Sequence, residues 1–275
     1  MAEQDLAVGE RGRGDRAERA ERVRRALAEA ETATGLRPVE HFAVEVDAEP
    51  RAARPAGEPS DAAALPEGWL GIPEALRPAL PGIRRGSSVS VTGSTSLLLH
   101  LVAHLSVQGA WCVMVARPEL GLAAAVDAGI DPARLVLIPD PGPQAPDVLG
   151  ALVDGFDIVV LGPCRALEAR DRRALGARIR HRGAILIATT SWEGADVRLQ
   201  AQQQRWEGLK PGGGHLREER MVVVGSGRGI DIPRTCEVVI GREGTGTRLM
   251  AAHERPVPVT APAGTAHGLA ERRAG

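Results

Sequence analysis

The stretch from Ser88 to Gln108 has the residue types of an apolar strand, a tight turn and an apolar helix, the order that builds phosphate-binding loops. The turn consists of Gly93, Ser94, Thr95 and Ser96. A hydrolytic loop follows the pattern G-x-x-x-x-G-K-[ST], whereas this turn is shorter, lacks the second glycine and has an apolar residue at the lysine position. Lys210 is the only lysine of the chain, so none nearby can replace it. We interpret residues 93–96 as a degenerate phosphate-loop position in which Ser94 or Thr95 caps the helix, with weak anion binding as the alternative.

The partner of such a loop in NTP hydrolysis is an acid at the end of a neighbouring strand, where it holds the metal ion. In the apolar run 157–161 that place belongs to Gly162, and Asp157 stands at the start of the run, at the wrong edge for a ligand. Both halves of the apparatus are missing, so we expect no ATP hydrolysis, no catalytic residue and no cofactor, ATP included. The missing lysine and acid together favour a protein that is not an enzyme. Glu119 and Asp140 follow two other runs and are candidates to line a site, although turn and capping roles are more common for such residues.

Two further patterns resemble binding motifs but are better explained by a role in packing or in a turn. His100 and His104 are spaced i,i+4, but one helix offers only two metal ligands, so we expect a core or interface stripe and no metal site. The run Gly225-x-Gly-x-Gly229 is followed by Ile-Asp-Ile-Pro, which cannot open a helix. It therefore predicts a hairpin turn and not a dinucleotide loop.

A basic helix is predicted over residues 166–181. Its candidate face for DNA phosphate or an acidic partner consists of Arg172, Arg173, Arg178 and Arg180. A merely solvated face is the alternative, because the chain has 34 basic and 35 acidic residues and a net charge of −1. Nucleic-acid binders usually carry a basic excess.

The elements that would position these residues form an α/β pattern. Apolar runs at 88–92, 111–116, 135–138, 157–161 and 184–190 alternate with helical patterns at 97–108, 120–128, 144–153 and 166–181. Continuous apolar strands are typical of a sheet covered on both faces, so we expect a doubly wound, mostly parallel sheet. Further strand patterns at 197–204, 219–224, 230–232 and 236–240 predict antiparallel hairpins at one edge of that sheet.

The flanking regions are predicted to stay outside this domain. We divide the 275 residues into a charged helix and disordered linker (1–64), an α/β domain (65–248) and a disordered tail (249–275). The helical pattern at 17–34 has charge pairs and few apolar residues, so we expect residues 1–60 and 251–275 to be dispensable for folding. The chain has no apolar run of membrane-spanning length, residues 1–15 are charged and lack the apolar stretch expected of a secretory signal, and the three cysteines are far apart. These features predict a cytoplasmic protein with no membrane partner.

Several segments resemble the core of the RecA family of ATPases. Residues 80–93 resemble the lead-in to its first core strand and phosphate loop, and residues 129–138 resemble its step from second helix to third strand. Residues 157–161 and 184–190 match its fourth and fifth strands, and the predicted hairpins match the antiparallel strands that close its core. The resemblance covers residues 65–242 and implies a RecA-like fold.

Within the RecA/SulA superfamily the chain is most similar to ImuA, a group of shortened mutagenesis accessory proteins. The Gly-Ser-Thr-Ser-Leu-Leu-Leu turn and the Pro-Glu-Leu-Gly and Pro-Asp-Pro-Gly turns carry this similarity. It implies a non-catalytic docking protein in the SOS response to DNA damage, acting in translesion synthesis beside an ImuB-like polymerase scaffold and an error-prone replicative-type DNA polymerase. A nucleotide- or DNA-binding recombinase paralogue and a SulA-like cell-division inhibitor are the alternatives.

Overall fold

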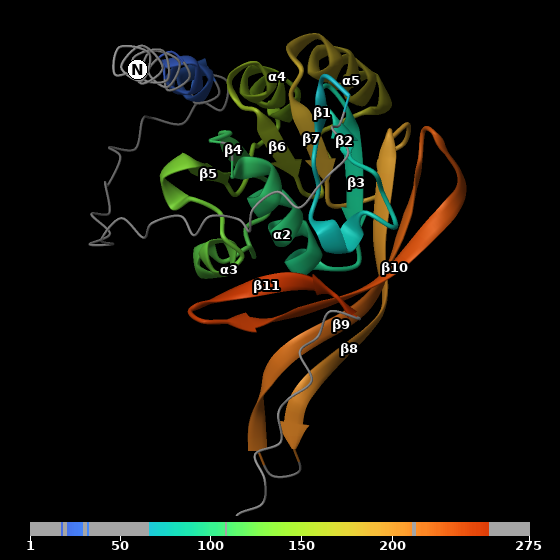
Figure 1. The fold of residues 1–275 in the computed structure, drawn as a ribbon. Coiled ribbons are helices and arrows are strands. Elements are labelled where there is room, and N and C mark those ends of the chain that lie inside the picture. Colours follow the sequence, from blue (N-terminus) through green and yellow to red (C-terminus); the bar gives the residue numbers. More distant parts are fainter. Residues whose placement is uncertain are drawn as a thin grey trace, which may run out of the picture.

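The computed structural model describes residues 18, 21–29, 32, 66–107, 109–210 and 213–252. Their dominant feature is a nine-stranded sheet with the order β11-β10-β9-β8-β3-β7-β6-β4-β5 (Figure 1). The predicted linker at 35–64 and the tail beyond residue 252 lie outside the described residues.

The parallel half of the sheet follows the predicted alternation of strands and helices. Its strands are β3 (Ser88–Thr92), β4 (Cys112–Val115), β5 (Leu135–Ile138), β6 (Ile158–Leu161) and β7 (Ile185–Ala188). The intervening helices are α2 (Thr95–Ser106), α3 (Leu122–Asp127), α4 (Ala145–Gly155) and α5 (Ala169–Arg182). All contacts among these strands are parallel, and β3 also pairs in parallel with β8. The predicted α/β class with a mostly parallel sheet is confirmed.

The antiparallel half begins at β8 and is larger than predicted. It consists of β8 (Val197–Lys210), β9 (Gly213–Gly227), β10 (Ile230–Glu243) and β11 (Gly246–Ala251). Gly227 pairs with Ile230 across the β9–β10 turn, so the glycine-rich run forms a hairpin turn as predicted. The strand β11 was not predicted, and it extends past residue 248, where we placed the start of the tail.

Four short elements complete the described structure. They are β1 (Trp69–Leu70), the 3-10 helix η1 (Glu74–Leu76), β2 (Ile83–Arg84) and the 3-10 helix η2 (Pro132–Arg134). No helix within the described ranges is long and apolar enough to cross a membrane.

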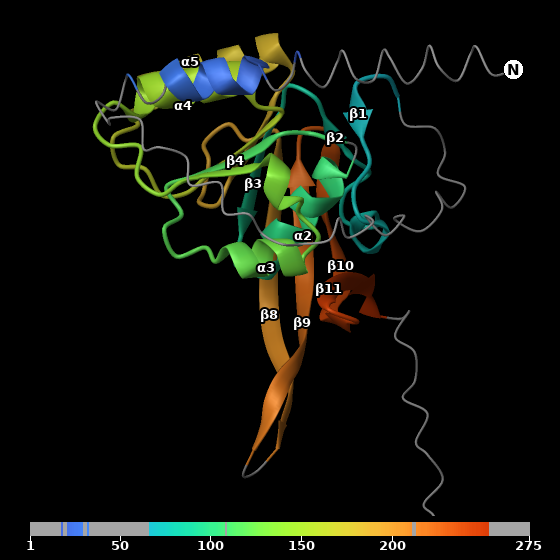
Figure 2. The ribbon, with the colours of Figure 1, turned by 90° about the vertical axis from the view of Figure 1, so that its left-hand side faces the viewer.

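Helices cover both faces of the parallel strands. Since successive strand residues point to opposite faces, each strand contributes side chains to both hydrophobic clusters. In β4, Cys112 and Met114 join the cluster that contains α2 and α3, while Val113 and Val115 join the cluster under α4 and α5. Figure 2 shows α4 and α5 on one side of the strands and α2 and α3 on the other. Both faces being apolar explains why these strands are continuous hydrophobic runs.

The N-terminal helix packs on the domain, which contradicts its predicted solvated character. Residues 21–29 are helical, and Val23 and Ala26 are 2% and 3% exposed within the cluster under α4. The approach is close, since a Cβ added to Gly155 would lie 2.3 Å from the Cβ of Ala26. Two small apolar residues one helical turn apart were too few to signal burial in the sequence. Their partner, a glycine at the end of α4, becomes visible only in the fold.

Candidate functional site at the degenerate phosphate loop

The predicted cap of α2 is confirmed. Ser94 has extended backbone angles, and its hydroxyl accepts a hydrogen bond from the Leu97 backbone N–H at 3.1 Å. The hydroxyl therefore satisfies one of the free N–H groups at the helix start that a bound phosphate would otherwise use.

A carboxylate from β9 occupies the side of the loop next to this cap. Glu219 is 2% exposed, and its Oε1 accepts hydrogen bonds from Ser94 Oγ and Gln204 Nε2, each at 3.1 Å. Gln204 Nε2 also donates to the carbonyl oxygen of Gly93 at 2.7 Å. The loop, β8 and β9 are thus joined by one polar cluster with an acid at its centre.

The backbone of β8 closes over the loop itself. Gly93 has a φ of +91°, a conformation that side chains rarely adopt. A Cβ at this position would lie 2.3 Å from the carbonyl oxygen of Ala201. Glycine is therefore required here for close approach of β8, which is a packing role distinct from the cradling of a phosphate.

The position of a metal-binding acid is also closed by packing. A Cβ at Gly162 would lie 1.9 Å from the carbonyl oxygen of Ala116 at the end of β4. Ala116 has a φ of +56°, so the backbone at this edge is in a conformation rare for alanine. Asp157 stays at the opposite end of β6, where its Oδ2 accepts a hydrogen bond from the Trp111 backbone N–H at 2.9 Å.

One arginine near the loop was missed by the sequence reasoning. The Arg117 side chain is only 11% exposed, donates to Thr95 Oγ1 at 3.3 Å and pairs with Glu119. The Glu119 carboxylate accepts a hydrogen bond from its own backbone N–H, which lowers the pKa of the carboxyl, and the hydrogen bond from Arg117 lowers it further. The signal for Arg117 was its place directly after the β4 run, at the edge where α/β sheets bind ligands. Asp140 has the turn role expected of it, accepting from the Gly142 N–H at 2.8 Å.

The two histidines of α2 occupy different environments. His100 is 7% exposed, and its imidazole faces the carbonyl oxygen of Ser96, 2.8 Å from Nδ1, and the backbone of Thr247. His104 is exposed. Burial lowers the pKa of the His100 imidazole. The pKa of His104 is also lowered, because neighbouring atoms partly desolvate the ring although its surface is exposed, and the nearby Arg77 adds to this effect. The described residues contain no group of three or more side chains placed to hold a metal ion.

The basic helix α5 uses half of its predicted face internally. The Arg172 Cζ lies 5.1 Å from the centre of the Trp192 ring, and Arg178 forms a bidentate ion pair with Asp154 on α4. Hydrogen bonds from Arg178 lower the pKa of the Asp154 carboxyl to about 2, with Arg182 contributing. Arg173 and Arg180 are exposed, and among the described residues they form no hydrogen bond or ion pair. Arg173 and Arg180 are therefore the two members of the candidate DNA or partner face that the internal contacts leave unengaged.

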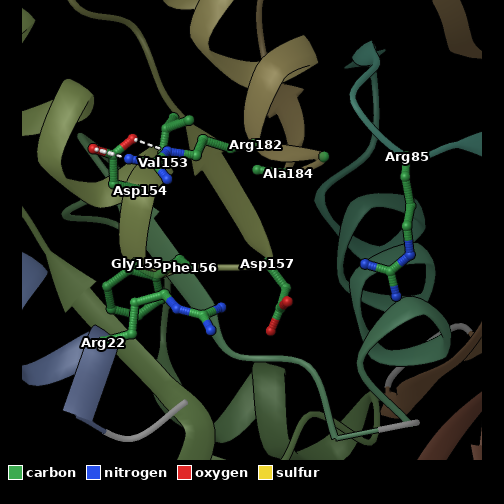
Figure 3. Close-up of a pocket in the computed structure, with 10 residues that line it drawn as sticks. Arg22, Arg85, Val153, Asp154, Gly155, Phe156, Asp157, Arg182 and Ala184 are labelled. Carbon is green, nitrogen blue, oxygen red and sulfur yellow. Dashed lines mark hydrogen bonds and ion pairs between the residues drawn. The ribbon is translucent and has the colours of Figure 1, made fainter. Parts of the chain in front are cut away.

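A cavity of about 250 Å³ lies at the amino-terminal edge of the parallel strands, away from the loop. Figure 3 shows Arg22 of the N-terminal helix, Arg85 before β3 and Asp157 before β6 around this space. The lining of this cavity comes from elements that meet only in the fold, so no sequence pattern predicts it.

The fold defines the class, an α/β protein with a mostly parallel sheet, in which the buried Glu219 carboxylate is hydrogen-bonded to Ser94 at the start of α2. Residues 76–194 match the family model described as the MT3502 N-terminal domain. Over 165 residues the chain is 37% identical to Rv3395c, an uncharacterized protein of Mycobacterium tuberculosis, covering 57% of this chain and 78% of that relative. The chain belongs to the family of this mycobacterial protein.

Proposed function

We propose that the protein is a non-catalytic, RecA-like accessory protein of the ImuA type that docks translesion polymerases during SOS mutagenesis. The sequence resemblance over residues 65–242 is the starting point, and membership of the Rv3395c family is compatible with it. The hairpins that extend the sheet beyond β3 agree with the antiparallel strands that the resemblance implies.

One observation carries the non-catalytic part of the proposal. The buried Glu219 carboxylate lies against Ser94 at the start of α2, where a nucleotide-binding protein needs positive charge for phosphate. A phosphate at this place would meet a second anion in a poorly solvated site, and like charges there repel strongly. Gly162 admits no acid for a metal ion, so the stabilisation of transferring phosphoryl groups is absent on both sides.

A fold retained without its phosphate chemistry is suited to binding other macromolecules. The proposed partners are an ImuB-like polymerase scaffold and an error-prone replicative-type DNA polymerase, in the cytoplasm. Direct DNA contact would use Arg173 and Arg180 through phosphate, because α5 has no Phe, Tyr or Trp on which a base could stack.

Phosphate release by the purified protein with Mg²⁺ and single-stranded DNA tests the catalytic part. We expect the background rate for the wild type and for Ser94→Ala alike. ATP turnover that Ser94→Ala abolishes would contradict the proposal and favour the recombinase paralogue.

Pull-down of the tagged protein from DNA-damaged cells tests the docking part. Recovery of a polymerase scaffold is the expected result. Recovery of a cell-division protein in its place would support the SulA-like alternative and overturn the proposed pathway.

A further inference from the structure

The hairpin arm consists of residues 202–210 of β8 and residues 213–222 of β9, which pair with each other as β8 continues past β3. The last pair between β3 and β8 joins Thr92 and Gln200, after which β8 continues to Lys210. The strand β10 pairs with β9 as far as Glu218, which lies across from Glu207. Arg205–Glu207 is therefore the edge of a three-stranded sheet, and only the end of the hairpin is a two-stranded ribbon. Figures 1 and 2 show this ribbon projecting away from the helices in both views.

The edge of β8 that faces away from β9 is open in this arm. Within the described residues, no strand lies on the side of β8 that faces away from β9 beyond Gln200. Register shifts occur between Gln202 and Arg205 and between Glu207 and Leu209, and they leave Arg205–Glu207 as a regular stretch between two irregular ones. Such irregularities hinder the pairing of other chains with an exposed edge strand, so only the short stretch Arg205–Glu207 is regular enough to accept a further strand.

Two side chains of this stretch, Arg205 and Trp206, have unusual surroundings for a folded protein. Arg205 lies directly across from Arg220, a like charge, while Arg220 is paired with Glu207 at 3.5 Å. Arg205 itself has no acidic partner among the described residues. Trp206 lies on the face of the sheet opposite to Arg205 and is 52% exposed, so a large apolar side chain is left in water.

We propose that the open edge of β8 receives an extended segment of a partner protein in which acidic and apolar residues alternate. Main-chain hydrogen bonds to Arg205–Glu207 would add the segment as a further strand. The alternation of a strand then places an acid beside Arg205 on one face and an apolar side chain beside Trp206 on the other. Tryptophan and arginine are the residue types that most often dominate binding energy at interfaces. The inference rests on the proposed function only in that a docking protein needs such a partner.

A binding titration with the full-length protein tests this surface directly. The probe is a short fluorescein-labelled peptide of alternating glutamate and valine, followed by fluorescence anisotropy. Its counterpart with lysine for glutamate reports on charge, and its counterpart methylated on alternate backbone nitrogens reports on strand pairing. We expect the glutamate peptide to bind about tenfold more tightly than either counterpart, because both lose one of the two recognition elements.

Variants of the arm locate the site. Arg205→Glu and Trp206→Ala should each weaken binding of the glutamate peptide by about tenfold. The matched control is Arg198→Glu, an exposed arginine of the same strand where β3 already occupies the edge, and it should bind as the wild type does. Melting curves confirm that the variants are folded.

Three results would overturn the inference. They are equal binding of the glutamate and lysine peptides, wild-type binding by Arg205→Glu, and a dimer in sedimentation that Trp206→Ala dissociates, since a second copy would then occupy the edge. Each leaves the proposed function standing, because ATP turnover and polymerase pull-down are measured separately. Conversely, peptide binding without polymerase recovery would keep the docking edge and refute the pathway.

Discussion

Substitution of Val23 measures whether the N-terminal helix belongs to the folded domain. Val23 is 2% exposed under α4, and Val23→Ala removes two methyl groups from that contact. At about 0.8 kcal/mol for each buried methyl-sized group, plus a small cavity, the free energy of unfolding should fall by about 2 kcal/mol. For a domain of this size that corresponds to a decrease in Tm of roughly 4–8 °C.

Thermal unfolding followed by circular dichroism is a suitable assay, with Arg25→Ala as the matched control. Arg25 lies two residues further along the same helix and is exposed, so its substitution should change stability by less than about 0.5 kcal/mol. A variant lacking residues 1–33 should melt still lower, because it also removes Ala26 and the half-buried Leu27 and so uncovers the surface of α4 that they cover. Identical melting of Val23→Ala, Arg25→Ala and the wild type would refute the packing argument and restore the expectation that residues 1–60 are dispensable.

Three other predictions concern the sheet edge and the basic helix. Gly162→Asp should lower the free energy of unfolding by about 3 kcal/mol or more in urea titrations, because its Cβ would overlap a backbone carbonyl oxygen, whereas Gly121→Asp, which has open space, should be tolerated. Asp154, with its pKa lowered to about 2 from 3.8, should contribute stability in full above about pH 4 and lose it as the pH falls toward 2, and Asp154→Asn should flatten this part of the stability profile. Arg173→Glu with Arg180→Glu should weaken any DNA retention in a strongly salt-dependent way while leaving Tm within a few degrees, and retention that is unchanged would identify a solvated face.

The element pattern of the parallel half was predictable because local chemistry dominates there. The run Ile158–Leu161 is apolar on both faces, and Gly183 with a φ of +71° ends α5 where the sequence placed its stop. The cap at Ser94 is likewise a local hydrogen bond, within three residues of its donor. The long strands β8 and β9 were underestimated, because their distal parts are polar and exposed and give no burial pattern to read.

The candidate site divides along the same line. The absence of a lysine after the 93–96 turn and the presence of Gly162 after the apolar run 157–161 are residue types at fixed spacing, so the sequence by itself determined that these positions lack the groups of a hydrolytic phosphate loop. Which group occupies the loop depended on a contact between positions 94 and 219, and no local pattern encodes a pairing of that separation. Only the tertiary structure could bring the Glu219 carboxylate to the start of α2, because sheet pairing of β8 and β9 beside β3 sets that distance. The same holds for Arg178, whose charge is evident in the sequence but whose use against Asp154 is decided by the packing of α5 on α4.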